Sequence, residues 1–327
     1  MHGIALALAL TAPQRASIDS IVRYVMGDHH VLGLSLAVVR DGQIVYAHGY
    51  GFADRRRTVR TTPHTVFAIA SLEKSFVAAS VLRLAERGRL SLDDTLATYV
   101  PWYAAARNVT VAELLKHTSG IPDYAQLPDF DRGARQPVSP ESLVRRVASL
   151  PLAFAPGTST RYSNTDYVLL GIIVQDVTHV PLAAWLRRDL LAPLRLDETA
   201  SWNPFLDEPN RAQGSVAAGS ASLAFAAAGL ESSALDMARW IDDLFALRVV
   251  DAADLARMFS GMGFFSGNIG TLRGAWHSGY VEGYSSYVAI VPSRRLGVVL
   301  LSNADAVDLG PLAQSVVEDA LRGSAKE

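Results

Sequence analysis

Two β-hairpin patterns, one near each end of the chain, constrain the fold more than any other feature. β-rich runs at 33–40 and 43–50 are joined by Asp41-Gly42, which suits a type I′ turn because that turn needs positive φ at both central residues. Near the other end, similar runs at 284–291 and 296–302 flank a Pro-Ser-Arg-Arg turn. Hairpin strands are antiparallel, so the sequence predicts one antiparallel sheet built from both termini.

Helical periodicity fills most of the chain between these hairpins. Apolar residues recur at helical spacing before the first hairpin and again over 309–321. In the middle, helices are expected at 72–88, 110–117, 139–150, 164–178 and 181–191. The fold class is therefore predicted as α/β (α+β), an antiparallel sheet flanked by helices with a mainly helical insertion. We assign 1–69 and 221–327 to a sheet domain and 70–220 to a helical domain, with the active site in the cleft between them.

Composition excludes several classes of partner and chemistry. The chain has 327 residues and a formal net charge of −2, which argues against nucleic acid as a partner. The absence of cysteine removes disulfides and thiolate chemistry. No apolar run reaches the roughly 18 residues of a membrane span. We expect a small-molecule or peptide substrate, no membrane span, no metal and no organic cofactor, and the sequence leaves the oligomeric state open.

The N-terminus bears on localisation. Residues 4–10 resemble the apolar part of a secretory signal, but no Lys or Arg precedes them. Residues 1–12 are either a signal remnant or a frayed start. Export to the periplasm or the medium is favoured over the cytoplasm.

The motif Ser71-Leu-Glu-Lys74 supplies a candidate nucleophile and base. Only three of the 30 basic residues are lysines, so a lysine at a given position in this chain calls for an explanation. At helical spacing Lys74 lies over Ser71, and a lysine whose pKa is lowered by burial can take the serine proton. The alternative is an N-cap serine beside a surface lysine. The chain has no Gly-x-Ser-x-Gly elbow, no His-Glu-x-x-His and no P-loop.

Two further patterns follow in order along the chain. Tyr162-Ser-Asn164 enters the predicted helix at 164–178, and His277-Ser-Gly279 lies near the end of a predicted strand before Tyr284. Taken separately, the three motifs are explained equally well as ordinary structural features: a half-buried aromatic, a helix cap and a turn at the edge of a strand. The three motifs together make those separate readings unattractive. A further cluster at 28–30, Asp-His-His, is interpreted as helix-end polar residues because no third metal ligand is recognisable.

With these motifs, the sequence resembles the serine β-lactamase and penicillin-binding-protein superfamily in its class C-like branch. That branch includes D-alanyl-D-alanine carboxypeptidases, D-amino-acid peptidases and a family of esterases. The matching stretches are Phe67-Ala-Ile-Ala-Ser71-Leu-Glu-Lys74-Ser-Phe76, Leu114-Leu-Lys-His-Thr-Ser-Gly-Ile-Pro-Asp123, Pro156-Gly157 before Arg161-Tyr-Ser-Asn164, Ala228-Gly-Leu-Glu-Ser-Ser233 running on to Asp236-Met-Ala-Arg-Trp240, and Trp276-His-Ser-Gly279. The resemblance implies a β-lactamase/transpeptidase-like fold, an antiparallel sheet flanked by helices plus a helical domain.

The resemblance also implies roles for individual residues. Ser71 would be the acylated nucleophile and Lys74 its proton partner. Tyr162 would pass a proton to the leaving group, with its pKa lowered by the Lys74 ammonium. Asn164 would bind the substrate amide.

The segment from His277 to Tyr280 would complete the site. His277, Ser278 and Gly279 would line the substrate strand, and the backbone N–H groups of Ser71 and Tyr280 would form the oxyanion hole.

Two positions depart from the family pattern, and a third is a candidate cation. Class C β-lactamases usually carry Lys where His277 stands, and a mostly neutral imidazole is a weak anchor for a carboxylate. Glu73 stands where a small hydroxyl or apolar residue is commoner in the family. It is inert if it faces away from Lys74, and would hold that lysine protonated if it faces it. Arg273 shares a strand face with His277 and could approach a substrate carboxylate, although an exposed turn residue is the simpler interpretation.

Three functions remain open from the sequence. The first is a serine hydrolase on peptide-like amides, resembling a D-alanyl-D-alanine carboxypeptidase or a D-amino-acid peptidase. The second is a carboxylesterase on small acyl esters with weak or no β-lactamase activity. The third is a non-catalytic binding or scaffold member of the superfamily.

Overall fold

The first hairpin forms as its sequence predicts. In the computed structural model, which describes residues 9–130, 136–203, 210–216 and 224–322, β1 (Gly33–Arg40) pairs antiparallel with β2 (Gln43–Gly51). Asp41 and Gly42 have φ of 49° and 82°, the two positive values that a type I′ turn requires.

The two ends of the chain meet in one antiparallel sheet. The strand order is β2-β1-β9-β8-β7-β6, and β1 from the first hairpin pairs with β9 from the last, Leu36 opposite Leu300. The later strands are β6 (Phe265–Ile269), β7 (Leu272–Val281), β8 (Tyr284–Val291) and β9 (Leu296–Ser302). The predicted fold class is confirmed.

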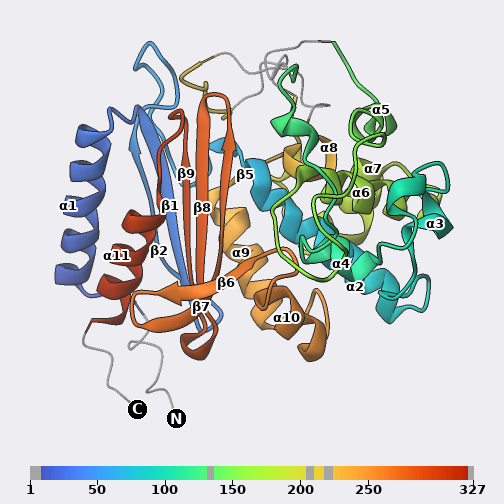
Figure 1. Cartoon of the computed structure of the whole chain (residues 1–327). Coiled ribbons are helices and arrows are strands. Elements are labelled where there is room, and N and C mark those ends of the chain that lie inside the picture. The colour runs from blue at the N-terminus through green and yellow to red at the C-terminus, as the bar shows by residue number, and fades with distance from the viewer. Residues whose placement is uncertain (1–8, 131–135, 204–209, 217–223, 323–327) are drawn as a thin grey trace.

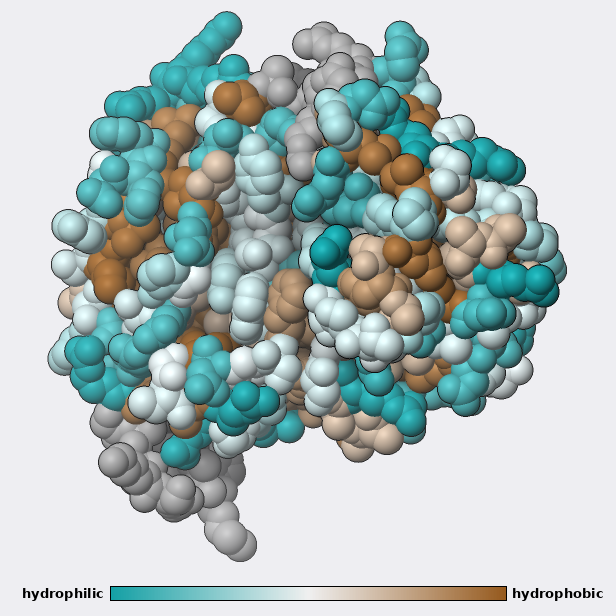
Figure 2. Space-filling model, viewed as in Figure 1, coloured by the Kyte–Doolittle hydropathy of each residue, from teal (hydrophilic) through white to brown (hydrophobic). Residues whose placement is uncertain are grey.

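Helices cover both faces of this sheet. Figure 1 shows α1 (Ala12–Asp28) and α11 (Gly310–Leu321) on one face and α9 (Ala234–Phe245) on the other. Side chains of β1 alternate between the layers, so Leu36 packs on the α1 and α11 side and Ala37 on the other. Figure 2 shows hydrophobic side chains along the seam where α1 meets the rest of this layer.

The remaining helices gather beside the sheet, on the right in Figure 1. They pack around α2 and α6, whose side chains form much of the larger hydrophobic core. Their bounds are α2 (Glu73–Glu86), α3 (Leu96–Tyr99), α4 (Val111–Leu115), α5 (Pro140–Arg145), α6 (Asn164–Thr178), α7 (Leu182–Leu186), α8 (Phe225–Ala228) and α10 (Ala252–Phe259), with short helical turns η1 (Ala70–Leu72), η2 (Ala104–Ala106), η3 (Tyr124–Gln126) and η4 (Arg187–Leu191). A further turn, η6 (Pro292–Arg294), joins β8 to β9 within the sheet.

A small second sheet connects the sheet and the helices. Its order is β3-β5-β4, with β3 (Val66–Ala68), β5 (Leu230–Ser233) and β4 (Ala200–Ser201). β3 leads directly into η1 and α2. The division into domains at 69/70 and 220/221 stays a prediction.

The expected helices agree in place and differ in length. The helix expected at 139–150 ends at Arg145, because the following residues make tighter i−3 bonds, such as Val147 N–H to the Val144 carbonyl at 3.0 Å. The sequence interpretation named neither α9 nor α10. Of the apolar run at 4–10, residues 4–8 lie outside the described residues.

Within the described ranges, no single helix has the length and apolar character needed to cross a membrane. Taken together, α6 and the segment Leu182–Leu191 have that length and apolar character, but their axes are bent by 73° relative to each other.

Candidate active site

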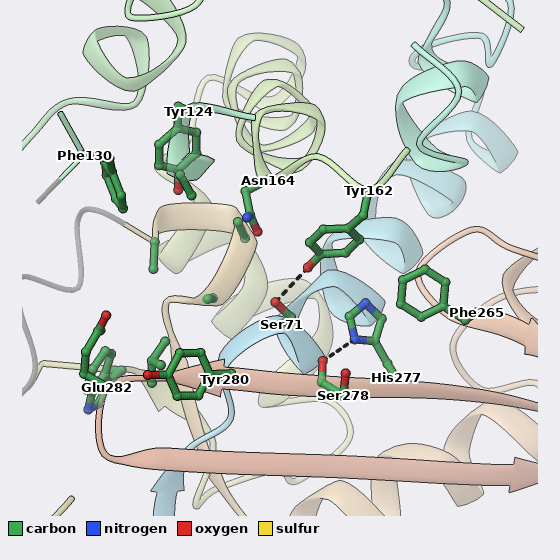
Figure 3. Close-up of a pocket in the computed structure, with 16 residues that line it drawn as sticks. Ser71, Tyr124, Phe130, Tyr162, Asn164, Phe265, His277, Ser278, Tyr280 and Glu282 are labelled. Atoms are coloured by element: carbon green, nitrogen blue, oxygen red, sulfur yellow. Dashed lines mark hydrogen bonds between the residues drawn. The ribbon is translucent and has the colours of Figure 1, made fainter. Parts of the chain in front are cut away.

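Ser71 lies at the junction between a strand and a helix, in the middle of η1. The preceding residue, Ala70, has φ of 49°, a left-handed conformation that costs an alanine energy. Neighbouring strands hold this turn in place: the Ser286 hydroxyl donates to the Ile69 carbonyl at 2.8 Å, and the Ile69 N–H donates to the Leu230 carbonyl at 3.0 Å. Ser71 is thus presented at the start of α2 by a strained but well-supported turn (Figure 3).

Lys74 is completely buried one helical turn after Ser71. Its Nζ donates to Ser71 Oγ at 3.0 Å, to Asn164 Oδ1 at 3.0 Å and to the Ala227 carbonyl at 2.6 Å. Burial lowers the pKa of Lys74 to about 7, against the opposing effects of Glu73, Asp123 and Asp166. A lysine with this pKa is partly neutral at neutral pH, and a neutral amine 3.0 Å from Ser71 Oγ can accept the hydroxyl proton.

Tyr162 is the second side chain that contacts the Ser71 hydroxyl. Its hydroxyl donates to Ser71 Oγ at 2.8 Å, and Lys74 Nζ lies 4.9 Å from the centre of its ring. The expectation that Lys74 lowers the pKa of Tyr162 is wrong. Burial raises this pKa, since the cost of desolvating a phenolate exceeds the effect of the Ser71 hydrogen bond. Tyr162 is therefore a phenol that can give a proton, and Lys74 is the better base of the two.

Asn164 begins α6 and links the base to a second carboxylate. Its Oδ1 accepts from Lys74 and its Nδ2 donates to Asp123 Oδ2 at 3.0 Å. Burial raises the pKa of Asp123, and the hydrogen bonds from Ala125 and Asn164 oppose that rise. Asp123 thus fixes the orientation of the Asn164 amide, with its oxygen towards Lys74. The sequence interpretation gave Asp123 no role, although it ends one of the stretches that carry the resemblance.

A buried pair, His117 and Asp166, packs behind Tyr162 and Ser163 at this part of the site. His117 Nδ1 lies 3.3 Å from Asp166 Oδ2, and the centre of the His117 ring lies 4.6 Å from that of the Tyr162 ring, with the two planes tilted by 44°. Burial raises the pKa of Asp166 well above its usual range and lowers that of His117 well below its own, so burial disfavours the charged form of each. The Ser119 hydroxyl completes the group by donating to Asp166 Oδ1 at 2.6 Å. No sequence motif pointed to this pair, because its members are 49 residues apart.

The segment from His277 to Tyr280 forms one wall, on β7. His277 is buried, its Nδ1 lies 2.6 Å from the Ser278 carbonyl, and burial lowers its pKa to about 3. Its imidazole is therefore neutral. Gly279 packs directly on the turn that carries the nucleophile: a Cβ there would lie 2.5 Å from the Ile69 carbonyl oxygen. Only a glycine allows β7 to come so close to η1.

These residues share one cavity of about 340 Å³. Figure 3 shows Ser71 near its middle, Phe265 and His277 at one end, and Tyr280 and Glu282 at the other. The described lining is largely aromatic and apolar. It consists of Ser71, Tyr124, Ala125, Phe130, Tyr162, Asn164, Trp202, Ala224, Ala227, Ala228, Phe265, His277, Ser278, Tyr280, Val281 and Glu282.

Two residues singled out by the sequence are not among the residues that line the cavity. Glu73 is buried, but its Oε2 accepts a short hydrogen bond from the Gly229 N–H and makes no ion pair with Lys74 within the described residues. Burial raises the pKa of Glu73 to about 8. Arg273 is exposed on β7, where its guanidinium donates to Ser266 Oγ at 3.4 Å, and it is not among the lining residues.

One acidic group in the described part of the chain has a spacing compatible with a metal, and it is not at this site. Glu86, Asp251 and Asp254 bring ligand atoms within 4.8 Å of one another. The Asp251 N–H donates to Glu86 and the Asp251 side chain caps α10, so local structure already uses these carboxylates. The Asp-His-His cluster lies at the end of α1, with His29 as its C-cap.

Comparison with known proteins now decides the family. The beta-lactamase family matches residues 18–320, nearly the whole chain. The chain belongs to the beta-lactamase family. This beta-lactamase-fold family consists of serine hydrolases, and the resemblance stated from the sequence motifs is confirmed.

Curated relatives of this beta-lactamase family member are bacterial. Protein flp of Staphylococcus aureus strain COL is 27% identical over 322 residues, which cover 90% of this chain and 64% of flp. The chain thus spans less than two thirds of that relative. The putative penicillin-binding protein PbpX of Bacillus subtilis strain 168 is 25% identical, over 81% of this chain and 69% of PbpX.

Solved structures support the same fold. An octameric penicillin-binding protein homologue from Pyrococcus abyssi is 26% identical with a TM-score of 0.83, over 93% of this chain and 76% of that chain. The D-amino acid amidase from Ochrobactrum anthropi SV3, complexed with L-phenylalanine amide, has a TM-score of 0.88 over 96% of this chain and 100% of that chain. At 23% identity that match shows the fold alone.

Proposed function

We propose that this protein is a serine hydrolase that forms an acyl-enzyme at Ser71 and cleaves amides of D-configured amino acids. One observation carries the proposal: Ser71 Oγ receives hydrogen bonds from both Lys74 Nζ and Tyr162 OH inside a cavity large enough for a substrate. A surface serine with a structural role would need neither partner.

The proposed reaction uses each group in one protonation step. Neutral Lys74 takes the Ser71 proton as Oγ attacks the carbonyl carbon, and the backbone N–H groups of Ser71 and Tyr280 hold the developing oxyanion. Tyr162 then protonates the leaving group, and Lys74, now charged, restores the phenol proton across the site. Water repeats the sequence in reverse to release the acyl group. Asn164 orients Lys74 and is available to the substrate amide.

The choice among substrates rests on charge and on the relatives. The described lining contains no fixed cation, because His277 is neutral and Arg273 is not among the lining residues. A free C-terminal carboxylate therefore lacks an anchor there, which favours neutral amides over carboxypeptidase substrates. The D configuration is supported by the names of the structural neighbours, a D-amino acid amidase and a D-stereospecific amidohydrolase from Streptomyces.

A carboxylesterase is the second candidate, and the aromatic lining favours it. Tyr124, Phe130, Trp202 and Phe265 would accept a small apolar acyl or alcohol group without any polar anchor. The same acyl-enzyme chemistry would serve both activities, so the two candidates differ in substrate and not in mechanism.

Covalent labelling tests the shared part of the proposal. A fluorescent fluorophosphonate should label the wild-type protein, with the adduct located at Ser71 by mass spectrometry, and should not label Ser71→Ala. Ser75→Ala is the matched control, since Ser75 is a buried serine one turn away whose hydroxyl donates to the Leu72 carbonyl. Equal labelling of wild type and Ser71→Ala would contradict the proposal, and no labelling of either would favour a binding or scaffold role. Among active preparations, D-amino acid anilides and p-nitrophenyl esters separate the two candidates.

A further inference from the structure

Glu282 is the one charged side chain in the described lining of the cavity. The other lining residues are apolar, aromatic or neutral polar, and the buried His277 is neutral because its pKa is lowered to about 3. Glu282 is partly exposed, and within the described residues its carboxylate makes no hydrogen bond or ion pair. A single carboxylate that lines an otherwise uncharged cavity favours a positively charged ligand.

The turn that carries Glu282 is held by hydrogen bonds and close packing. Glu282 and Gly283 connect β7 to β8, and the Gly283 N–H donates to Asp305 Oδ1 at 2.7 Å. The Tyr280 hydroxyl donates to the same oxygen at 3.2 Å. Gly283 has φ of 87°, and a Cβ there would lie 2.8 Å from the Val216 carbonyl oxygen, so the turn packs closely on this neighbouring backbone and requires a glycine. The Glu282 backbone is therefore fixed relative to the wall of the cavity.

The two ends of the cavity have different roles in the proposed reaction. The rings of Tyr162, Phe265 and His277 gather at one end, with the Tyr162 ring 5.8 Å from Phe265 and 6.1 Å from His277. Because Tyr162 protonates the leaving group, the leaving group occupies this end. The acyl group bound to Ser71 must then extend past Tyr280 towards Glu282, at the opposite end in Figure 3.

The spacing between Tyr280 and Glu282 limits how far from the scissile carbonyl a positive charge on the substrate must lie to reach Glu282. Glu282 follows Tyr280 by two residues, which places their α-carbons about 6 to 7 Å apart. If the Tyr280 N–H holds the oxyanion, an α-ammonium group beside the scissile carbonyl lies short of Glu282. A charge at the end of a side chain the length of lysine or ornithine reaches it.

We propose that Glu282 forms a subsite for a cationic group on the acyl portion of the substrate, several atoms from the scissile carbonyl. The preferred substrates are then amides or esters of acyl groups that carry a terminal ammonium or guanidinium. This inference rests on the acyl transfer at Ser71 in the proposed function, and it further specifies that the acyl group of the substrate is positively charged.

Paired substrates that differ only in this charge test the inference. p-Nitroanilides of D-lysine and D-norleucine form one pair, and p-nitrophenyl esters of 6-aminohexanoic and heptanoic acid form the other. Wild type should prefer the charged member of each pair. Glu282→Gln, which keeps the shape and removes the charge, should lose about tenfold in kcat/KM for the charged members and less than twofold for the neutral ones. The wild-type preference should also weaken as ionic strength rises.

A matched variant separates this effect from a general change in charge. Glu318→Gln removes a carboxylate on the exposed surface of α11, and it should leave the substrate preference unchanged. Equal losses for charged and neutral substrates in Glu282→Gln, or no loss for either, would overturn the subsite.

The two substrate pairs also separate this inference from the proposed function. Charge selection with the esters, combined with no cleavage of either anilide, would support the subsite and contradict the amidase proposal. Cleavage of both anilides at equal rates would support the amidase proposal and contradict the subsite. Failure of all four substrates would contradict both.

Discussion

Lys74 has only neutral hydrogen-bond partners in the described site, and this explains its chemistry. A hydroxyl, an amide oxygen and a backbone carbonyl surround Nζ, and none of them is a carboxylate. Carbonyl and amide oxygens orient the amine without the full charge that would keep it protonated. Burial can therefore lower its pKa to about 7.

Lys74→Arg should fold and lose at least about 10³-fold in acylation rate, because a guanidinium stays protonated and cannot take the serine proton. Burst kinetics with a chromogenic ester measure the acylation rate, and thermal unfolding checks the fold. Lys116→Arg, at an exposed lysine, is the control and should retain full activity. An active Lys74→Arg enzyme would show that Lys74 is not the base.

Glu73 affects Lys74 through charge and not through a direct bond. Its carboxylate binds the Gly229 N–H while Lys74 binds the Ala227 carbonyl, so consecutive residues of α2 hold the same short segment. An ionised Glu73 raises the pKa of Lys74. Asp123 and Asp166 act in the same direction, and His117, His277, Tyr162 and Tyr167 are the other titratable groups around the amine.

Glu73→Gln should shift the acidic limb of the pH–rate profile to lower pH by less than about 0.5 unit, because the pKa of Glu73 is raised to about 8 and its carboxyl is largely neutral on that limb. The glutamine can still accept the Gly229 N–H, so the variant changes charge more than structure. The measurement is kcat/KM from pH 5 to 9, with Glu318→Gln as the surface control. A lowered rate with an unshifted midpoint would mean that Glu73 acts through its hydrogen bond alone.

At the scale of elements, the site depends on the close approach of β7 to η1. Gly279 lies against Ile69 and Ser286, and a Cβ there would be 2.2 Å from Ser286 Oγ as well as 2.5 Å from the Ile69 carbonyl oxygen. The serine side chain can turn away, but the carbonyl belongs to the backbone that presents Ser71. Any added atom must therefore move the strand relative to the nucleophile.

Gly279→Ala should reduce acylation by at least about tenfold while destabilising the fold by only about 1 to 3 kcal/mol, as overpacking does. Acylation rate and chemical denaturation measure the two effects. Gly27→Ala, in α1 where a Cβ meets no atom within 4 Å, should leave acylation unchanged and stabilise the fold by about 0.5 to 1 kcal/mol. Full activity in Gly279→Ala would mean that this contact does not position Ser71.

For the whole molecule, buried histidines make stability depend on pH. Burial lowers the pKa of His277 to about 3, whereas an unfolded histidine titrates near 6.5. Below pH 6.5 the unfolded chain gains a proton that the folded chain does not accept. The stability from a neutral His277 is complete above pH 6.5 and is lost as the pH falls from there towards 3.

Between pH 6 and 4 the wild type should lose up to about 1.4 kcal/mol more per pH unit than His277→Asn, which cannot titrate there. Urea denaturation at several pH values gives the difference. Raised pKa values at Asp166 and Glu73 act in the opposite direction in both proteins and cancel in the comparison. His29→Asn, at an exposed histidine, should run parallel to wild type. Parallel curves for His277→Asn would contradict a buried neutral imidazole.

The sequence by itself determined the features that depend on short spacing. The Asp41-Gly42 turn, the strands on either side of it and the last hairpin follow local rules of backbone conformation and alternation. The motifs at Ser71, Tyr162 and His277 were recognisable for the same reason, because each is only three or four residues long. Their order along the chain was enough to identify the family.

Tertiary structure decided the features that depend on long-range contacts. Glu73 could face Lys74 or turn away, and the Gly229 N–H, 156 residues later, settles its direction. The raised pKa of Tyr162 could not be read from the motif, because desolvation depends on everything packed around the ring. Glu282 had no motif at all. It matters only because the turn after β7 brings it to the cavity of Ser71, and local sequence rules do not contain that distance.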